Sequence, residues 1–205
     1  MALSLWLGFL AAAVLIAISP GPGAVVSMST GLRNGYGAAF RVILGLQAAL
    51  LLQMLIVALG LGALLASSQT AFNLVKLIGA SYLIWLGIQK WRSAPQEVDE
   101  NRPRGAPNKL FAEGLLVNLT NPKAIVFMAA LMPQFLDPAR PQWPQFLIIG
   151  LTMCGVDTIV MSCYALLATR LRRCLHDPKW LKAQNRFFGG VFVGAGVLLA
   201  NSGRA

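Results

Sequence analysis

Long apolar runs separated by short polar connections dominate the chain. They predict helices near Leu3–Thr30, Phe40–Leu65, Thr70–Gln89, Leu110–Leu136, Gln145–Thr169 and Phe187–Asn201. Crossing about 30 Å of hydrocarbon takes about 20 helical residues, and the runs reach or approach this length. The pattern therefore predicts an all-α integral membrane protein with six transmembrane helices.

The sixth run is the shortest. Its apolar part, residues 187–200, would rise only about 21 Å as a helix. Starting the helix at Leu181 restores the length if Lys182 and Arg186 extend their charged ends to the membrane surface. Five spans plus one interfacial helix is the alternative.

The first and fourth runs are each interrupted near the middle by helix-breaking residues. The sequence SPGPG occupies residues 19–23, and Asn121 precedes Pro122 in the fourth run. Backbone groups freed by a proline cannot face lipid, so each break should be buried in protein or line a wet cavity. A kink that merely eases helix packing is the alternative for each proline.

The two breaks are related by an internal repeat. A shift of 100 residues places Pro22 on Pro122 and gives seven identities in 19 positions. We expect a single membrane domain, residues 1–205, with repeats at about 1–92 and 108–205 joined by a polar linker at 93–107. Since each repeat has three spans, the halves would insert in opposite directions, as in the inverted repeats of many secondary transporters.

Composition and charge agree with a membrane location. The chain of 205 residues is 57% hydrophobic and 12% charged, with a net charge of +10. Thirteen of its 17 Lys and Arg residues fall in the first, third and fifth connections, whereas only Arg140 and Arg204 lie on the opposite side. This asymmetry predicts cytoplasmic odd-numbered connections and both termini outside. The basic residues are spread over several short connections instead of lining one face, which argues against nucleic acid as a partner.

The N-terminal run has no Lys or Arg before it, so we interpret it as a retained span rather than a secretory signal. Cys154, Cys163 and Cys174 form no CxxC pair, and no cluster of His and Cys suggests a metal site. We therefore expect no cofactor and no enzymatic activity. A membrane thiol oxidoreductase is the alternative, and a close cysteine pair would have favoured it.

The helix breaks predict where a substrate binds. Beyond each proline a new half-helix begins, and its free N–H groups and positive dipole end favour a carboxylate. The candidate substrate-binding residues flank the two breaks: Pro20, Gly21, Pro22, Gly23, Ala24, Asn118, Asn121, Pro122, Lys123 and Ala124.

Two charged residues fall deep within spans. An ionised Asp157 near the bilayer centre would cost about 2.5 to 3.5 kcal/mol on insertion scales, so it needs compensation. Lys123 is the natural partner either for Asp157 or for a substrate carboxylate. Asp157 would bind the substrate ammonium or a coupling proton, and a purely structural ion pair or interhelical hydrogen bond is the alternative.

Further polar residues within the spans could line a cavity. Gln47 and Gln53 in the second run and Lys76 and Tyr82 in the third are the candidates. Helix-to-helix hydrogen bonding is the alternative for the glutamines, and snorkelling is the alternative for Lys76. The GxxxG spacing of Gly190 and Gly194 favours close helix contact, within the chain rather than in a dimer.

Five segments together resemble the lysine exporter superfamily, in the branch of homoserine and threonine efflux proteins. They are SPGPG, STGLRNGYGAAFRVILG, VKLIGASYLIWLGIQKWR, GLLVNLTNPKAIVFMAALMPQF and GVDTIVMSCYALLATRLRRCL. The resemblance implies a bacterial inner-membrane exporter of amino acids, driven by the proton gradient and commonly dimeric. The family often has a polar residue where Gly23 stands, so a polar contact there is not expected.

Together these observations predict a secondary active exporter of small, neutral amino acids. Proton-coupled antiport with alternating access would move the substrate, and membrane lipid and a second copy of the chain are the expected partners. A neutral substrate is expected because Asp157 is the only acidic residue deep in the spans. A transporter of inorganic ions with a related fold is the alternative.

Overall fold

The computed structural model describes residues 1–67, 69–94, 109–137, 139–175 and 177–201. Side chains are described throughout these ranges except at residues 61–73, 75, 76, 130 and 169–175. The predicted linker at 93–107 lies almost wholly outside the described residues. So does the side chain of Lys76.

The described residues are almost entirely helical and include no strand. Its elements are α1 (Leu3–Ile18), α2 (Pro22–Asn34), α3 (Tyr36–Ser67), α4 (Gln69–Arg92), α5 (Leu110–Leu119), α6 (Pro122–Val126), the π-helix η1 (Phe127–Leu131), the 3₁₀-helix η2 (Met132–Phe135), α7 (Gln142–Leu175) and α8 (Pro178–Asn201). The start of α8 confirms that the sixth run extends before Phe187. Its 24 residues rise about 36 Å, enough to cross a bilayer.

Both predicted helix breaks are present. The axes of α1 and α2 differ by 55°, and those of α5 and the segment Pro122–Phe135 differ by 54°. Each second half begins with proline in its first turn, where the missing N–H has no intrahelical partner to lose. The same residue type therefore ends one half-helix and starts the next.

The candidate membrane spans were judged by length and mean hydropathy. Tyr36–Gly60 in α3 and Gln142–Ala168 in α7 pass as straight helices, with mean hydropathies of 2.4 and 1.9. The two bent pairs pass when each is counted as one span, which gives two to four candidates in the described residues. Helices α4 and α8 are not among these candidates.

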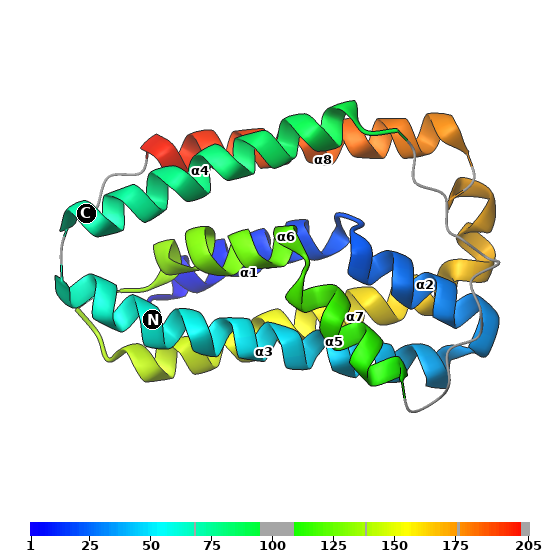
Figure 1. Ribbon diagram of the computed structural model, residues 1–205, viewed down its shortest axis with the longest axis horizontal. Helices are drawn as coiled ribbons and strands as arrows, with labels where there is room; N and C mark the ends of the chain where they lie inside the picture. Colours follow the sequence, from blue (N-terminus) through cyan, green and yellow to red (C-terminus); the bar gives the residue numbers. More distant parts are fainter. Residues whose placement is uncertain (68, 95–108, 138, 176, 202–205) are drawn as a thin grey trace.

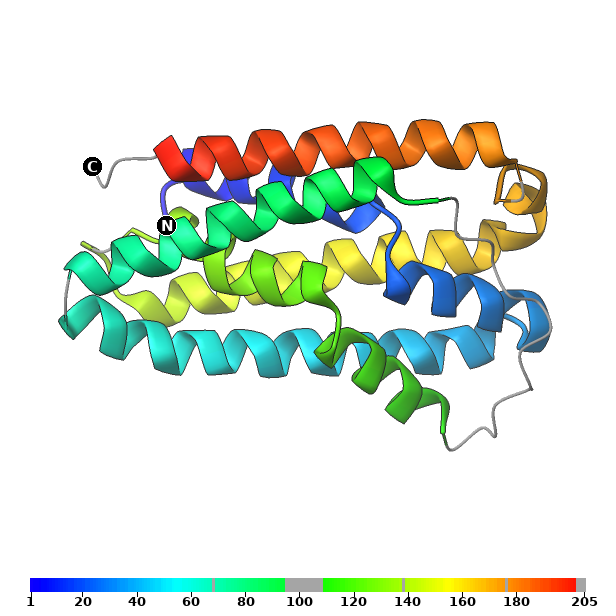
Figure 2. The same cartoon turned by 45° about the horizontal axis from the view of Figure 1, so that its top comes forward.

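The helices run roughly parallel to one long axis (Figures 1 and 2). α4 and α8 pack along each other at one side of the molecule, while α3 packs on α5, and α2 on α7. The start of α1 and the end of α8 lie toward the same end of the molecule (Figure 1). Helix breaks in α1–α2 and α5–α6 thus lie between the long helices rather than at the ends.

Glycines permit the closest helix crossings. A Cβ added at Gly45 of α3 would overlap the Phe111 carbonyl of α5, and one at Gly114 would overlap the Val42 carbonyl. Gly87 and Gly189 play the same part between α4 and α8. The GxxxG interpretation is wrong in detail, because Gly194 has no neighbour within 4 Å of an added Cβ.

An aromatic cluster closes the core beside the second break. The Phe9 ring lies 6.0 Å from that of Phe127 and 5.5 Å from that of Phe135, measured between ring centroids. Phe9 and Phe127 are almost fully buried. This cluster joins α1 to η1 and η2, and so ties the two broken helices together.

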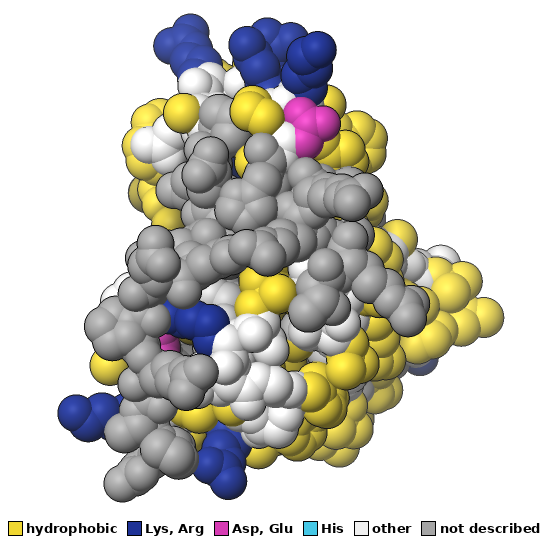
Figure 3. Space-filling model, turned by 90° about the vertical axis from the view of Figure 1, so that its right-hand side faces the viewer, with side chains coloured by type: hydrophobic (Ala, Val, Ile, Leu, Met, Phe, Trp, Pro, Cys, Tyr) yellow, Lys and Arg dark blue, Asp and Glu magenta, His cyan; other side chains and the backbone are white. Residues whose placement is uncertain are grey.

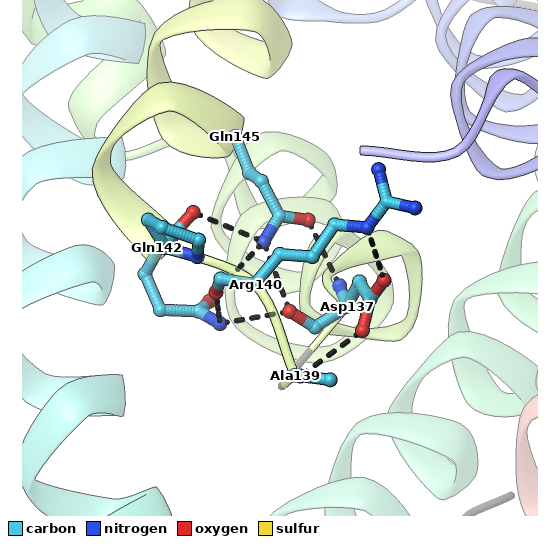
Figure 4. Close-up of polar contacts among 6 residues, drawn as sticks. Asp137, Ala139, Arg140, Gln142 and Gln145 are labelled. Carbon is cyan, nitrogen blue, oxygen red and sulfur yellow. Dashed lines mark hydrogen bonds and ion pairs between the residues drawn. The ribbon is translucent and has the colours of Figure 1, made fainter.

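A polar turn leads into α7, and Figure 4 shows Gln145 directed into it. Its Oε1 accepts from the Asp137 backbone N–H at 2.9 Å, and its Nε2 donates to the Asp137 carbonyl at 2.9 Å and the Pro141 carbonyl at 3.2 Å. Arg140 closes the turn with an ion pair to Asp137 at 3.1 Å. The buried Gln145 side chain therefore replaces missing backbone partners in this turn.

We expect Gly45→Ala to destabilise the fold by about 1 to 3 kcal/mol or more, because its Cβ meets backbone that cannot rotate away. Thermal unfolding in detergent measures this. Gly60→Ala in the same helix is the matched control, since no atom lies within 4 Å of its added Cβ. Equal losses of unfolding temperature in both variants would contradict the close crossing.

We expect Gln145→Met to lower stability by about 2 kcal/mol, because the buried groups of the turn lose their partners. The half-exposed Gln142→Met removes two hydrogen bonds and should cost less. Unfolding in detergent compares the two. A larger loss in Gln142→Met would refute this account of the turn.

Candidate functional site

At the end of α1, backbone carbonyls accept hydrogen bonds from side chains of three other elements. Lys123 Nζ donates to the Ile16 carbonyl at 2.9 Å and to the Ser19 carbonyl at 2.6 Å. Lys90 Nζ, from α4, donates to the Pro20 carbonyl at 2.6 Å, and Tyr164 Oη, from α7, donates to the Ile18 carbonyl at 2.5 Å. Two cations thus lie at the negative end of the α1 dipole.

The second break is held by amide side chains. Asn121 Oδ1 accepts from the Lys123 backbone N–H at 3.1 Å and so caps α6. Asn121 Nδ2 donates to Asn118 Oδ1 at 3.0 Å, while Asn118 Nδ2 donates to the Leu46 carbonyl of α3 at 2.9 Å. Gln53 Nε2 donates to the Asn118 carbonyl at 2.9 Å. The break is therefore anchored to α3.

A large cavity of about 720 Å³ lies beside the first break. Its walls include both helix breaks and the two lysines, the last turns of α4 and the first turns of α8. Its lining includes Pro20, Gly21, Lys90, Lys123, Tyr164 and Trp180. It extends to the end of the molecule where α4 finishes and α8 begins. Figure 3 views this end of the molecule. Lys and Arg side chains project at the edges of this face, and further Lys or Arg atoms are visible in a recess.

A second, much smaller cavity lies deeper. It measures about 30 Å³, which is room for water but not for an amino acid. Asp157, Lys123 and Asn118 line it together with Gly23 and Ala24. Lys123 and Asn121 line both cavities, so they form the wall between them.

Asp157 is held by Gln47. Gln47 Nε2 donates to Asp157 Oδ2 at 2.8 Å, whereas Gln47 Oε1 is buried without a partner in the described structure. No ion pair joins Asp157 to Lys123 among the described residues, and the Lys123 ammonium bonds the α1 carbonyls instead. The expected Asp157–Lys123 pair is thus not formed in this arrangement, because the carbonyls at the helix break hold the lysine.

Apart from Lys76, whose side chain lies outside the described residues, the predicted site residues divide into three groups. Those that line a cavity are Pro20, Gly21, Pro22, Gly23, Ala24, Asn118, Asn121, Pro122, Lys123, Ala124 and Asp157. Gln47 and Gln53 act through hydrogen bonds behind the cavity walls. Tyr82 lines neither cavity and packs on Trp85, with ring centroids 5.2 Å apart.

Sequence reasoning missed Lys90, Tyr164 and the tryptophans at the cavity. Lys90 was counted only as a basic residue of a connection, yet it reaches back to the first break. Trp85 and Trp180 line the large cavity from α4 and α8. The position of Lys90 could have suggested this contact, because a lysine in the last turn of a helix can direct its ammonium toward the protein interior. No such indication was available for Tyr164, which depends on how α7 packs against α1.

The described residues hold no cluster of three His, Cys, Asp or Glu side chains able to ligate a metal. The N-cap of α2 is Gly21, which makes no side-chain cap, and Gly23 and Ala24 line the small cavity together with Asp157. The half-helix end that was expected to take a carboxylate thus shares its cavity with one. Of the two cavities, the large one has room for a molecule of amino-acid size.

An apolar, all-helical chain in which two broken helices line one cavity has the architecture of a membrane transporter. The chain belongs to the LysE type translocator family, whose model matches residues 14–203. The family resemblance found in the sequence is therefore confirmed.

The relatives include proteins named for efflux. A homoserine/homoserine lactone efflux protein of Salmonella typhi is 45% identical over 204 residues, 98% of each chain. A leucine efflux protein of Klebsiella pneumoniae is 30% identical over 199 residues, 95% of this chain and 94% of the relative. An uncharacterized membrane protein of Vibrio cholerae is 45% identical over 203 residues, 98% of this chain and 99% of the relative. No solved structure matches significantly.

We expect Asn121→Ala to cost about 1 to 2 kcal/mol, because it removes both the cap of α6 and the bond to Asn118. Asn121→Ser keeps a capping oxygen and should lose less. Unfolding of the detergent-solubilised protein measures both. Equal stability of Asn121→Ala and the unaltered protein would show that the second break does not depend on this side chain.

Proposed function

We propose that this protein exports small amino acids with uncharged side chains from the cytoplasm. The observation that carries the proposal is the cavity of about 720 Å³ at the meeting of the two helix breaks, lined by Lys90 and Lys123. Its volume leaves ample room for an amino acid. The efflux names of two relatives, for homoserine and its lactone and for leucine, support substrates of this size and charge.

The topology we propose has six crossings in two inverted halves, with α1–α2 and α5–α6 as matched broken spans. The similar bends of 55° and 54°, and the common end for the start of α1 and the finish of α8, support it. The excess of positive charge supports a cytoplasmic location for the connections after α2, α4 and α7, with the protein in a bacterial inner membrane and both termini outside. The large cavity then faces the cytoplasm.

Alternating access follows from this placement. In the described state a substrate would enter from the cytoplasm and meet the helix breaks at the bottom of the large cavity. The buried cluster around Phe9 and Phe127 lies beyond them and closes the other side. Rocking of one half against the other would open that side and close the first.

Asp157 is our candidate for proton coupling. It lies in the small cavity next to Lys123, one wall away from the large cavity. An incoming proton on Asp157 would remove the negative charge that faces Lys123 and Gly23, and so change how strongly Lys123 is held at the break. Antiport requires this kind of link between proton and substrate.

The experiment uses the full-length protein in vesicles preloaded with labelled homoserine or leucine. We expect an inward-directed proton gradient to drive export, and Asp157→Asn to abolish this dependence while exchange without a gradient continues. Asp177→Asn, in the connection before α8, is the matched control. Undiminished proton-driven flux in Asp157→Asn would rule out the coupling role. Absence of flux for every amino acid tested would overturn the function itself.

A further inference from the structure

We infer that the carbonyl oxygens at the end of α1 form the binding site for the substrate ammonium, and that Lys123 and Lys90 occupy this site until the substrate displaces them. The inference rests on the proposed export of amino acids. It adds which group of the substrate is recognised, by which atoms, and what the two lysines do before the substrate arrives.

The carbonyl end of α1 is built for ammonium groups. The carbonyls of Ile16, Ser19 and Pro20 each accept a hydrogen bond from a lysine Nζ, at 2.9, 2.6 and 2.6 Å. They belong to the end of a helix, where backbone oxygens lack intrahelical partners and carry the negative end of the dipole. A substrate ammonium has the same charge and the same three donors as a lysine Nζ.

The site has spare capacity for a ligand. The side chain of Ser19 is fully buried, and its Oγ has no hydrogen-bond partner in the described structure. Gly21 lies against the lysine, because a Cβ added there would stand 3.4 Å from both Cε and Nζ of Lys123. Both Pro20 and Gly21 line the large cavity, so the carbonyl end is next to the space where a substrate would arrive.

Displacement is physically reasonable because the exchanging groups are alike. The lysine ammonium hangs on a flexible four-carbon stem, and the carbonyls it leaves would be satisfied at once by the substrate ammonium. No buried carbonyl is left unpaired during the exchange. The released lysine remains in the cavity wall as a cation, free to bind a substrate carboxylate.

Asp157 is the competing ammonium partner, and its surroundings favour the carbonyl end. The cavity at Asp157 measures about 30 Å³ and does not admit an amino acid. One of its oxygens already accepts from Gln47. Pro20 and Gly21 line the larger cavity, so a substrate there meets the carbonyl end as soon as the lysines give way.

The substrates named for one relative make the distinction testable. Homoserine and homoserine lactone share the ammonium group, but the lactone has no free carboxylate. A site that relied on the carboxylate would reject the lactone. A site that relies on carbonyl oxygens for the ammonium accepts both, and only homoserine gains a contact with the displaced lysine.

The test compares Lys123→Met with the unaltered protein in proteoliposomes, by exchange of labelled homoserine and labelled homoserine lactone. We expect the KM for the lactone to fall, because no lysine then competes for the carbonyls. Homoserine gains the same relief, but its carboxylate loses a cation contact worth about 1.4 kcal/mol, so the ratio of its KM to that of the lactone should rise about tenfold. Lys182→Met, an exposed lysine on α8 outside both cavities, should change neither value.

Further arms cover misfolding and separate this inference from the export function. Lys123→Arg keeps a cation at the carbonyls and should leave the KM for the lactone unlowered. If Lys123→Met does not fold, Lys90→Met provides the same comparison at Pro20. Equal rises for both substrates, or competition by 4-hydroxybutyrate as strong as by homoserine, would overturn the inference while export stands. Exchange of neither substrate by the unaltered protein would overturn both.

Discussion

The structure depends on satisfying the backbone that the first helix break sets free. An interrupted helix inside a bilayer leaves carbonyls that lipid cannot solvate, and each would cost several kcal/mol if left unpaired. Here Lys123, Lys90 and Tyr164 bond these carbonyls from α6, α4 and α7. The break is therefore stable only when the other helices are in place, and this requirement brings both lysines to the wall of the large cavity.

The second break is satisfied differently, and the difference gives the site its polarity. Asn121 and Asn118 bond one another and the carbonyl of Leu46, so no cation is needed there. The first break presents carbonyl oxygens to cations, whereas the second contributes the lysine that reaches them. Lys123 thereby links the two broken helices. In the alternating access that we propose, its contacts would change as the halves rock, and this would couple substrate binding to the motion.

Close packing of the helices and the polar site support one another. Gly45 and Gly114 let α3 and α5 approach until backbone meets backbone, and this approach brings Asn118 within reach of the Leu46 carbonyl. Gln47, the residue after Leu46 in α3, reaches Asp157 of α7. A partly buried carboxylate in an apolar protein is tolerated because its amide donor is held in place by the same crossing.

The sequence alone determined that the chain is helical and membrane-embedded, where its two helices break, and which family it belongs to. These follow from local properties: apolar length, proline's missing N–H, and matched motifs. It also singled out Lys123 and Asp157 as charged residues deep in the predicted spans. Only the tertiary structure decided that Lys123 bonds the carbonyls of α1 instead of Asp157, and that Lys90 and Tyr164 join it. The physical reason is that helix packing chooses a partner 70 to 146 positions away in the chain, which no local pattern encodes.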